Sequence, residues 1–208
     1  MHIILSGKHL VAISCFTLMC AYQFWKKQKC KKVQRAEVHE VIMFSHGDTK
    51  LKKSKYSRCF ITSSMDRLLL YLNSPRQNLD ICMYVLTNQD ITNILLKLLY
   101  RGVKIRVIAD ADMAFSSGST TKKLEKQGVP VRWMKSTNLM HHKFCLLDTF
   151  DETEEQIPLV MMGSMNWTNQ ALNGNWEDVA VTSQPELVRQ YKLEFEKLWV
   201  QFKPIVSF

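Results

Sequence analysis

Two short motifs in the second half of the chain combine residue types that could do phosphoryl chemistry. The first is His141-x-Lys143 followed by Asp148, in the spacing H-x-K-x4-D. In a strand over 139–147, alternate side chains share a face, so His141 and Lys143 would point the same way and His142 the other. An imidazole beside an ammonium suits one phosphate group. The ring can attack phosphorus or carry a proton, and the cation neutralises the non-bridging oxygens.

The second motif is Gly163-Ser164-Met165-Asn166. Ser164 and Asn166 lie two residues apart, so the same alternation would aim a hydroxyl and an amide at those oxygens. An isolated His-x-Lys pair is usually two exposed side chains on a strand with no function. Its coupling to an Asp at fixed distance and to the second motif weighs against chance. We therefore predict a phosphate site assembled from the ends of two short strands.

Together these motifs resemble the phospholipase D superfamily, which is known for its HKD motif. More narrowly they resemble the Zucchini/MitoPLD group, in which M-H-x-K-F and G-S-x-N-W-T recur before N-W-E or N-R-E. This chain has Asn175-Trp176-Glu177 there, and the resemblance covers roughly 36–203. It implies that Glu177 orients the catalytic imidazole, although a simple strand-entry glutamate remains open. It also implies that the role of Asp148 is at least partly structural.

The chain carries a single H-x-K motif, because no other histidine is followed by Lys two positions on. The resemblance implies two His-Lys pairs on opposite sides of the phosphorus. One histidine forms a phosphohistidine and the other protonates the leaving oxygen. We therefore expect a symmetric homodimer that brings two copies of His141 together across a twofold axis. We expect no metal or other cofactor, since two copies of Lys143 and the donors Ser164 and Asn166 can stabilise the charge.

These residues specify a phosphodiester and leave open the molecule that carries it. The resemblance implies a single-strand endoribonuclease at the mitochondrial surface that acts in piRNA precursor processing. Because the nucleophile is a histidine rather than a ribose 2′-OH, the products should carry 5′-phosphate and 3′-OH ends, and DNA should also be cut. The alternative is a cardiolipin hydrolase that yields phosphatidic acid. A non-catalytic membrane scaffold is a second alternative, which the intact motifs argue against.

Rival chemistries have weaker support. Asp110 and Asp112 could be metal ligands of a two-metal nuclease, but no further carboxylate has the spacing to complete such a site. Asp110 at a strand end and Asp112 as the cap of a turn explain the pair better than a metal site does. A Ser-His-Asp hydrolase would need a G-x-S-x-G elbow, which the sequence lacks. Four further residues are spaced more widely than zinc ligands normally are: Cys30, His39, His46 and Cys59.

The positive charge of the chain is concentrated near its N-terminus. The formal net charge is +9, and residues 26–58 hold 11 Lys and Arg against 3 Asp and Glu. From residue 59 onward the two signs balance at 16 each. The basic excess is therefore weak support for a polyanion-binding groove in the catalytic domain. It is better explained by the surroundings of the N-terminal segment.

That N-terminal segment is apolar over 10–25 and ends in Trp25-Lys26-Lys27. A cleaved signal peptide would carry its charge before the apolar run, and a buried helix would leave the basic flank unexplained. An uncleaved, single-pass anchor fits better, with a cytosolic catalytic domain according to the positive-inside rule. The resemblance places such an anchor in the mitochondrial outer membrane. We predict an anchor over 1–25, a basic linker over 26–35 and a phospholipase D-like domain over 36–208.

Within that domain, strand-like and helix-like patterns alternate, which predicts an α/β fold with a mixed sheet flanked by helices. The expected helices cover 62–72, 88–100, 119–126 and 184–202. The expected strands cover 38–44, 79–87, 103–109, 129–134, 139–147, 159–163 and 178–182.

Overall fold

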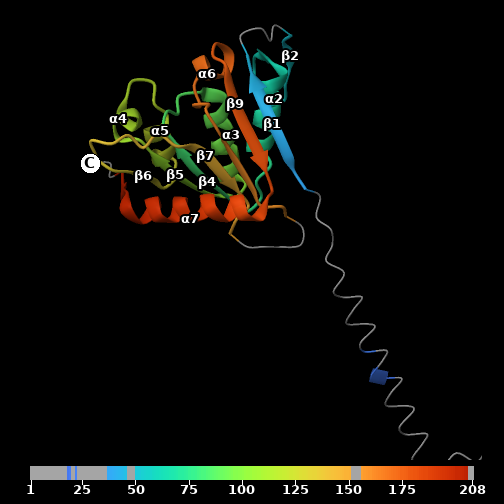
Figure 1. The fold of residues 1–208 in the computed structure, drawn as a ribbon. Coiled ribbons are helices and arrows are strands. Elements are labelled where there is room, and N and C mark those ends of the chain that lie inside the picture. Colours follow the sequence, from blue (N-terminus) through green and yellow to red (C-terminus); the bar gives the residue numbers. More distant parts are fainter. Residues whose placement is uncertain (1–17, 20–21, 23–36, 46–49, 151–155, 206–208) are drawn as a thin grey trace, which may run out of the picture. The chain divides into compact units, whose positions relative to one another are not determined.

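The computed structural model describes residues 18–19, 22, 37–45, 50–150 and 156–205 (Figure 1). The chain divides into two compact units, Met1–Arg35 and Ala36–Phe208. The predicted anchor and basic linker belong to the first unit and lie, apart from residues 18–19 and 22, outside the described residues. Among the described residues, no helix combines the length and the apolar character needed to cross a membrane.

The second unit alternates strands and helices along most of its length (Figure 1). Its strands are β1 (His39–Phe44), β2 (Lys52–Lys53), β3 (Phe60–Ile61), β4 (Asn78–Met83), β5 (Lys104–Ala109), β6 (Val131–Trp133), β7 (Lys143–Leu147), β8 (Leu159–Gly163), β9 (Glu177–Thr182) and β10 (Lys203–Pro204). Its helices are α2 (Ser63–Leu72), α3 (Gln89–Tyr100), α4 (Ala111–Phe115), α5 (Thr121–Lys126), α6 (Asn169–Asn173) and α7 (Pro185–Gln201).

The described strands form one large mixed sheet in the order β1-β9-β8-β7-β4-β5-β6-β10, and β2 and β3 form a separate hairpin. The β4–β5 and β5–β6 pairs are parallel, and the remaining pairs are antiparallel. Helix α7 packs on one face of the sheet, while α2 and α3 pack on the other (Figure 1). The predicted mixed sheet flanked by helices is confirmed.

The helices begin and bury the faces that their sequences predict. The Thr62 side chain accepts a hydrogen bond from the Met65 amide at the start of α2, and Asn88 caps α3 in the same way. The buried face of α2 is the predicted one, and consists of Met65, Leu68, Leu69 and Leu72. These residues recur with the period of a helix, which is why the sequence alone predicts which face of α2 is buried.

A buried ion pair, not foreseen from the sequence, fastens α7 to the sheet. The Arg106 guanidinium of β5 donates to both carboxylate oxygens of the fully buried Asp80 of β4, at 2.7 and 2.8 Å. It also donates to Glu196 of α7 at 2.6 Å. Burial raises the pKa of Asp80, and the hydrogen bonds from Arg106 oppose that rise.

The structure departs from the expected elements in several places. The strand expected over 79–87 ends at Met83, and α4, α6 and β10 were not expected. The polar segment over 47–58 contains β2 and leads into β3, although two-residue strands rich in lysine show no alternation of apolar residues. The motif strand expected over 139–147 begins only at Lys143. The chain before it is held differently, because the Met140 amide donates to the Asp110 carboxylate at 3.0 Å.

Candidate active site

His141 and Lys143 lie side by side at the N-terminal end of β7. The Lys143 ammonium is 3.1 Å from Nδ1 and 3.3 Å from Nε2 of His141, and it donates to the His141 carbonyl oxygen at 3.0 Å. The structure therefore brings the two side chains together, as their spacing predicts. The imidazole is exposed, so one phosphate group can reach both the ring and the cation.

An aromatic ring that the sequence motifs do not include supports this pair. Tyr84 follows β4, and its ring centroid lies 4.6 Å from that of His141. The Lys143 ammonium lies 5.4 Å from the centroid of the same ring. A cation over an aromatic face is attracted by the ring quadrupole, so Tyr84 helps to hold both groups in place. No motif marks Tyr84, because its role depends on the pairing of β4 with β7.

The surroundings of Lys143 change its acidity. A small cavity of about 10 Å³ beside it is lined mainly by apolar side chains, among them Met83, Met165 and Trp167. Burial lowers the pKa of Lys143, and the charge of the nearby Glu177 carboxylate opposes this shift. The ammonium therefore loses its proton at a lower pH than an exposed lysine would.

Ser164 and Glu177 form the second part of the site, at the facing ends of β8 and β9. The Ser164 hydroxyl donates to one carboxylate oxygen of Glu177, and the Asn175 amide donates to the other at 2.9 Å. The Asp178 amide donates to the Ser164 hydroxyl at 3.1 Å. Glu177 thus orients Ser164 within one chain. Its predicted role toward an imidazole stays a prediction.

Gly163 allows β8 and β9 to approach each other at this point. A Cβ atom on Gly163 would lie 2.1 Å from the carbonyl oxygen of Asp178, a backbone atom that cannot move aside easily. The glycine of the G-S-x-N motif is therefore required by close backbone packing. Its hydrogen-bond register with Val179 sets the position of Ser164.

One atom of the Asn166 side chain, its oxygen, has no partner in the part of the chain that the structure describes. This oxygen is buried. Asn166 lies between the buried residues Met165 and Trp167, and the Trp167 amide donates to the Val85 carbonyl at 3.0 Å. The backbone beside Asn166 is therefore held in place. The unpartnered oxygen is an acceptor, so the predicted role of Asn166 as a donor to phosphate oxygens stays a prediction.

Asp148 lies at the other end of β7, about 16 Å along the strand from Lys143 at ~3.3 Å per residue. Its buried carboxylate accepts hydrogen bonds from the backbone amides of Arg76, Gln77 and Asn78 at 2.7 to 3.2 Å. The residue adopts a positive φ of 53°. The structure therefore gives Asp148 the structural part of its expected role, which is to tie the entry of β4 to the end of β7.

Asp110 positions the segment in front of His141. One of its oxygens accepts from the amides of Asp112 and Met113 and so caps α4, and the other accepts from the Met140 amide. Of the explanations considered for Asp110 and Asp112, the structure supports capping, with Asp110 rather than Asp112 as the cap. Asp110 is 4% exposed, so water does not replace these bonds.

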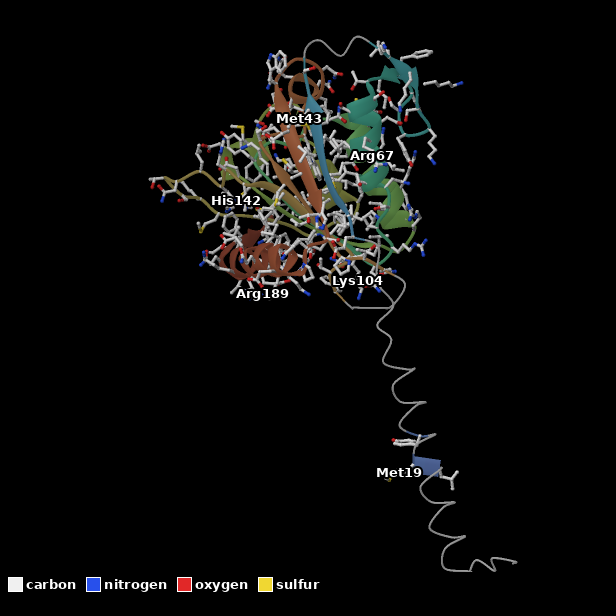
Figure 2. The ribbon with its side chains drawn as sticks, turned by 45° about the vertical axis from the view of Figure 1, so that its right-hand side comes forward. Met19, Met43, Arg67, Lys104, His142 and Arg189 are labelled. Atoms are coloured by element: carbon white, nitrogen blue, oxygen red, sulfur yellow. The ribbon has the colours of Figure 1, made fainter. Side chains whose placement is uncertain are left out.

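His142 faces away from the site, as strand alternation predicts. It lies on the α7 side of the sheet, 3.7 Å from Glu194 and edge-on to the Phe144 ring (Figure 2). In the described part of the chain, no group of three or more His, Cys, Asp or Glu side chains could hold a metal ion. His39 bonds to Thr182, whereas Cys30 and His46 lie outside the described residues.

Comparison with known families settles which superfamily this site belongs to. Residues 68–199 match the family model described as "Cardiolipin synthase, PLD-like domain". The chain belongs to this phospholipase D-like family. The superfamily predicted from the two motifs is thereby confirmed.

Curated relatives agree with this assignment. The chain is 39% identical over 157 residues to a "Mitochondrial cardiolipin hydrolase" of Chlamydomonas reinhardtii. The matched region covers 76% of this chain and 66% of that protein. It is 30% identical to the Drosophila melanogaster protein of the same name over 92% of this chain and 88% of that protein. The human relative is 36% identical, with 53% of its length matched. The names of these relatives agree with the predicted class of enzyme, a phosphodiesterase of the phospholipase D type.

Solved structures show the same fold. The phospholipase D family member Nuc from Salmonella typhimurium superposes with a TM-score of 0.66 at 20% identity, over 83% of this chain and 100% of that one. NucT from Helicobacter pylori superposes with a TM-score of 0.65 at 19% identity, over 82% of this chain and 100% of that one. At this level of identity the likeness concerns the arrangement of strands and helices.

Proposed function

We propose that this chain is a metal-independent phosphodiesterase that works through a phosphohistidine on His141. The contact of the His141 ring with the Lys143 ammonium carries the proposal. A ring nitrogen attacks phosphorus, a P–N bond forms, and the bond from phosphorus to the leaving oxygen breaks. Lys143 and Asn166 balance the charge on the remaining oxygens, and Ser164 joins them when its hydroxyl turns from Glu177 to the phosphate. Water then attacks phosphorus, the P–N bond breaks, and the imidazole is regenerated.

The leaving oxygen needs a proton, and a second His141 would supply it. We therefore propose a homodimer in which two copies of this site share one phosphate across a twofold axis. That second imidazole would later remove the proton from the attacking water. One feature of the surface supports the dimer. The His141 side chain is exposed, so it can face its copy in a second subunit.

The substrate we propose first is single-stranded RNA, cut at the mitochondrial surface to give 5′-phosphate ends for piRNA precursor processing. An attacking histidine needs no ribose 2′-OH, so single-stranded DNA should be cut as well. Relatives named as mitochondrial proteins support the location. The same proposal includes an anchor over 1–25 in the mitochondrial outer membrane, which leaves the catalytic domain in the cytosol.

Cardiolipin is the second candidate substrate, and the relatives' names favour it. The same attack on phosphorus would release phosphatidic acid. Both substrates therefore need the same His141 and Lys143, and only a direct comparison separates them.

The test compares the full chain with His141→Ala, and uses His142→Ala as the matched control on the neighbouring residue. Each protein is incubated with labelled single-stranded RNA and with cardiolipin vesicles, with and without EDTA. We expect His141→Ala to be inactive, His142→Ala to be active, and EDTA to have no effect. Activity in His141→Ala, or its loss in EDTA, would contradict the mechanism. Cleavage of cardiolipin without cleavage of RNA would leave the mechanism standing and replace the substrate.

Mixing subunits tests the shared site. If wild-type and His141→Ala subunits reassort freely at a 1:1 ratio, about a quarter of the dimers hold two intact histidines. The activity per wild-type subunit should then fall to about half of its value without mixing. Activity that is unchanged on mixing would show that each subunit works alone.

A further inference from the structure

A second cavity, of about 370 Å³, lies between the segment after β2 and the outer face of α3. Its volume falls within the range of ordinary ligand sites. Three cationic side chains line it, Lys55, Arg58 and Lys97, together with the aromatic rings of Tyr56 and Tyr100. None of these five residues belongs to the His141 site.

The charge of this cavity favours an anion. Asp90 is the acidic side chain among its lining residues, and it already accepts a hydrogen bond from the Ser57 hydroxyl at 2.8 Å. Among the described residues, neither Arg58 nor Lys97 forms an ion pair with a carboxylate. Two cations thus face the cavity without an acidic partner, and a phosphate group would neutralise them.

The two tyrosines narrow the class of ligand. Tyr100 is 75% exposed, and its hydroxyl donates to Gln127 at 3.0 Å, which holds the ring in place. The Lys55 ammonium lies 5.1 Å from the centre of the Tyr56 ring. Aromatic faces beside cations are the combination that binds single-stranded nucleic acid, because bases stack on the rings while the cations meet the backbone. A phospholipid headgroup needs the cations but gains nothing from the rings.

The fold connects this cavity to the catalytic motif. Helix α3 begins after Asn88, whose backbone amide donates to the Trp167 carbonyl at 2.9 Å. The Asn88 side chain also donates to Asn169 at 2.6 Å. Residues 167–169 follow directly after Asn166 of the site. The start of α3 is thus fixed beside the site, while Lys97 and Tyr100 lie in its last turn, about 14 and 18 Å along the helix from Asn88 at ~1.5 Å per residue. A polymer of several nucleotides could span that distance and contact both.

We propose that this cavity binds one nucleotide of the single-stranded nucleic-acid substrate, at a distance from the phosphate that is cut. Its phosphate meets Arg58 and Lys97, and its base stacks on Tyr100. The inference rests on the proposed phosphodiesterase function and adds a second contact that only a polymer can use. It also assigns part of the N-terminal basic excess, Lys55 and Arg58, to the folded domain.

Binding is tested in the full chain carrying His141→Ala, so that the RNA stays intact. Fluorescence anisotropy with a labelled single-stranded RNA compares the double variant Arg58→Gln/Lys97→Gln, Tyr100→Ala and the control Lys126→Gln on α5. We expect a dissociation constant raised about fivefold or more by each pocket variant, consistent with one stacked base or one phosphate contact. The double variant should also reduce the slope of log K against log salt by roughly 0.7. Thermal melting checks that each variant folds.

Cleavage separates this inference from the proposed function. With His141 intact, the double variant should cut a long RNA with a raised KM and an unchanged kcat, and a di- or trinucleotide like the wild type. Binding of RNA equal to that of Lys126→Gln would overturn the inference even if cleavage persists. The inference would also be overturned if the pocket variants bound RNA normally but lost their binding to cardiolipin vesicles, measured relative to phosphatidylcholine vesicles. Failure of the wild type to cut any RNA would remove the proposed substrate while leaving the binding result readable.

Discussion

Substitution of Asp148 tests whether the third letter of the HKD motif acts in chemistry or in folding. Its carboxylate accepts from three consecutive backbone amides, and the residue is 8% exposed. Hydrogen bonds to a charged group are worth ~1.5–3 kcal/mol each. Water can replace those of the exposed Arg76 and the half-buried Gln77, whereas the buried Asn78 amide would lose its partner. We therefore expect Asp148→Ala to lower the free energy of unfolding by about 3–5 kcal/mol.

Two further substitutions at Asp148 divide this loss into its causes. Asp148→Asn keeps one accepting oxygen and tolerates the positive φ of 53°, so it should cost about 1.5–3 kcal/mol. Asp148→Gly removes the carboxylate but relieves the backbone, so it should be about 1 kcal/mol more stable than Asp148→Ala. Urea unfolding followed by intrinsic fluorescence measures all three, with an unchanged m-value as the check on two-state behaviour.

The activity of the same variants decides the question. Because Asp148 lies at the far end of β7 from Lys143, folded Asp148→Asn should retain the kcat of the wild type. A variant that keeps its unfolding midpoint yet becomes as inactive as His141→Ala would refute this reasoning. It would place the Asp148 carboxylate in the reaction despite its backbone partners.

Three further changes have defined outcomes. Asp110→Ala should lower stability by about 2 kcal/mol and also lower kcat, because it frees the backbone before His141, whereas Asp112→Ala should change stability by less than about 0.5 kcal/mol in a thermal melt. Gly163→Ala should cost about 3 kcal/mol or more, or prevent soluble expression, and normal stability would contradict the close strand contact. Since burial lowers the pKa of Lys143, activity should fall with rising pH before the ordinary lysine value of about 10.4, and Lys143→Arg should shift that fall to higher pH. A pH–rate profile with no difference between the two proteins would exclude Lys143 as the group responsible.

The parts of the fold that were predictable depend on local repetition. Helices α2 and α3 follow from their caps and helical spacing, and β8 matches its expected bounds. The pairing of His141 with Lys143 needs only the alternation of neighbouring residues. These features are encoded within a few positions of the chain, so periodicity and spacing reveal them.

The parts that were missed depend on contacts between distant segments. Asp110 reaches Met140 across 30 positions, and Tyr84 meets His141 only because β4 pairs with β7. The ambiguity over Asp148 has the same origin, since its partners lie about 70 positions earlier. No local pattern marks such residues, because their roles arise from the order of strands in the sheet.

The antiparallel pairing of β7 with β8 has a practical consequence for engineering. Strand β7 ends at Leu147 and β8 begins at Leu159, and both of these strand ends lie at the end of the pair farthest from Lys143. An affinity tag or a fluorescent reporter inserted between the two strands would therefore join the fold far from the reacting groups.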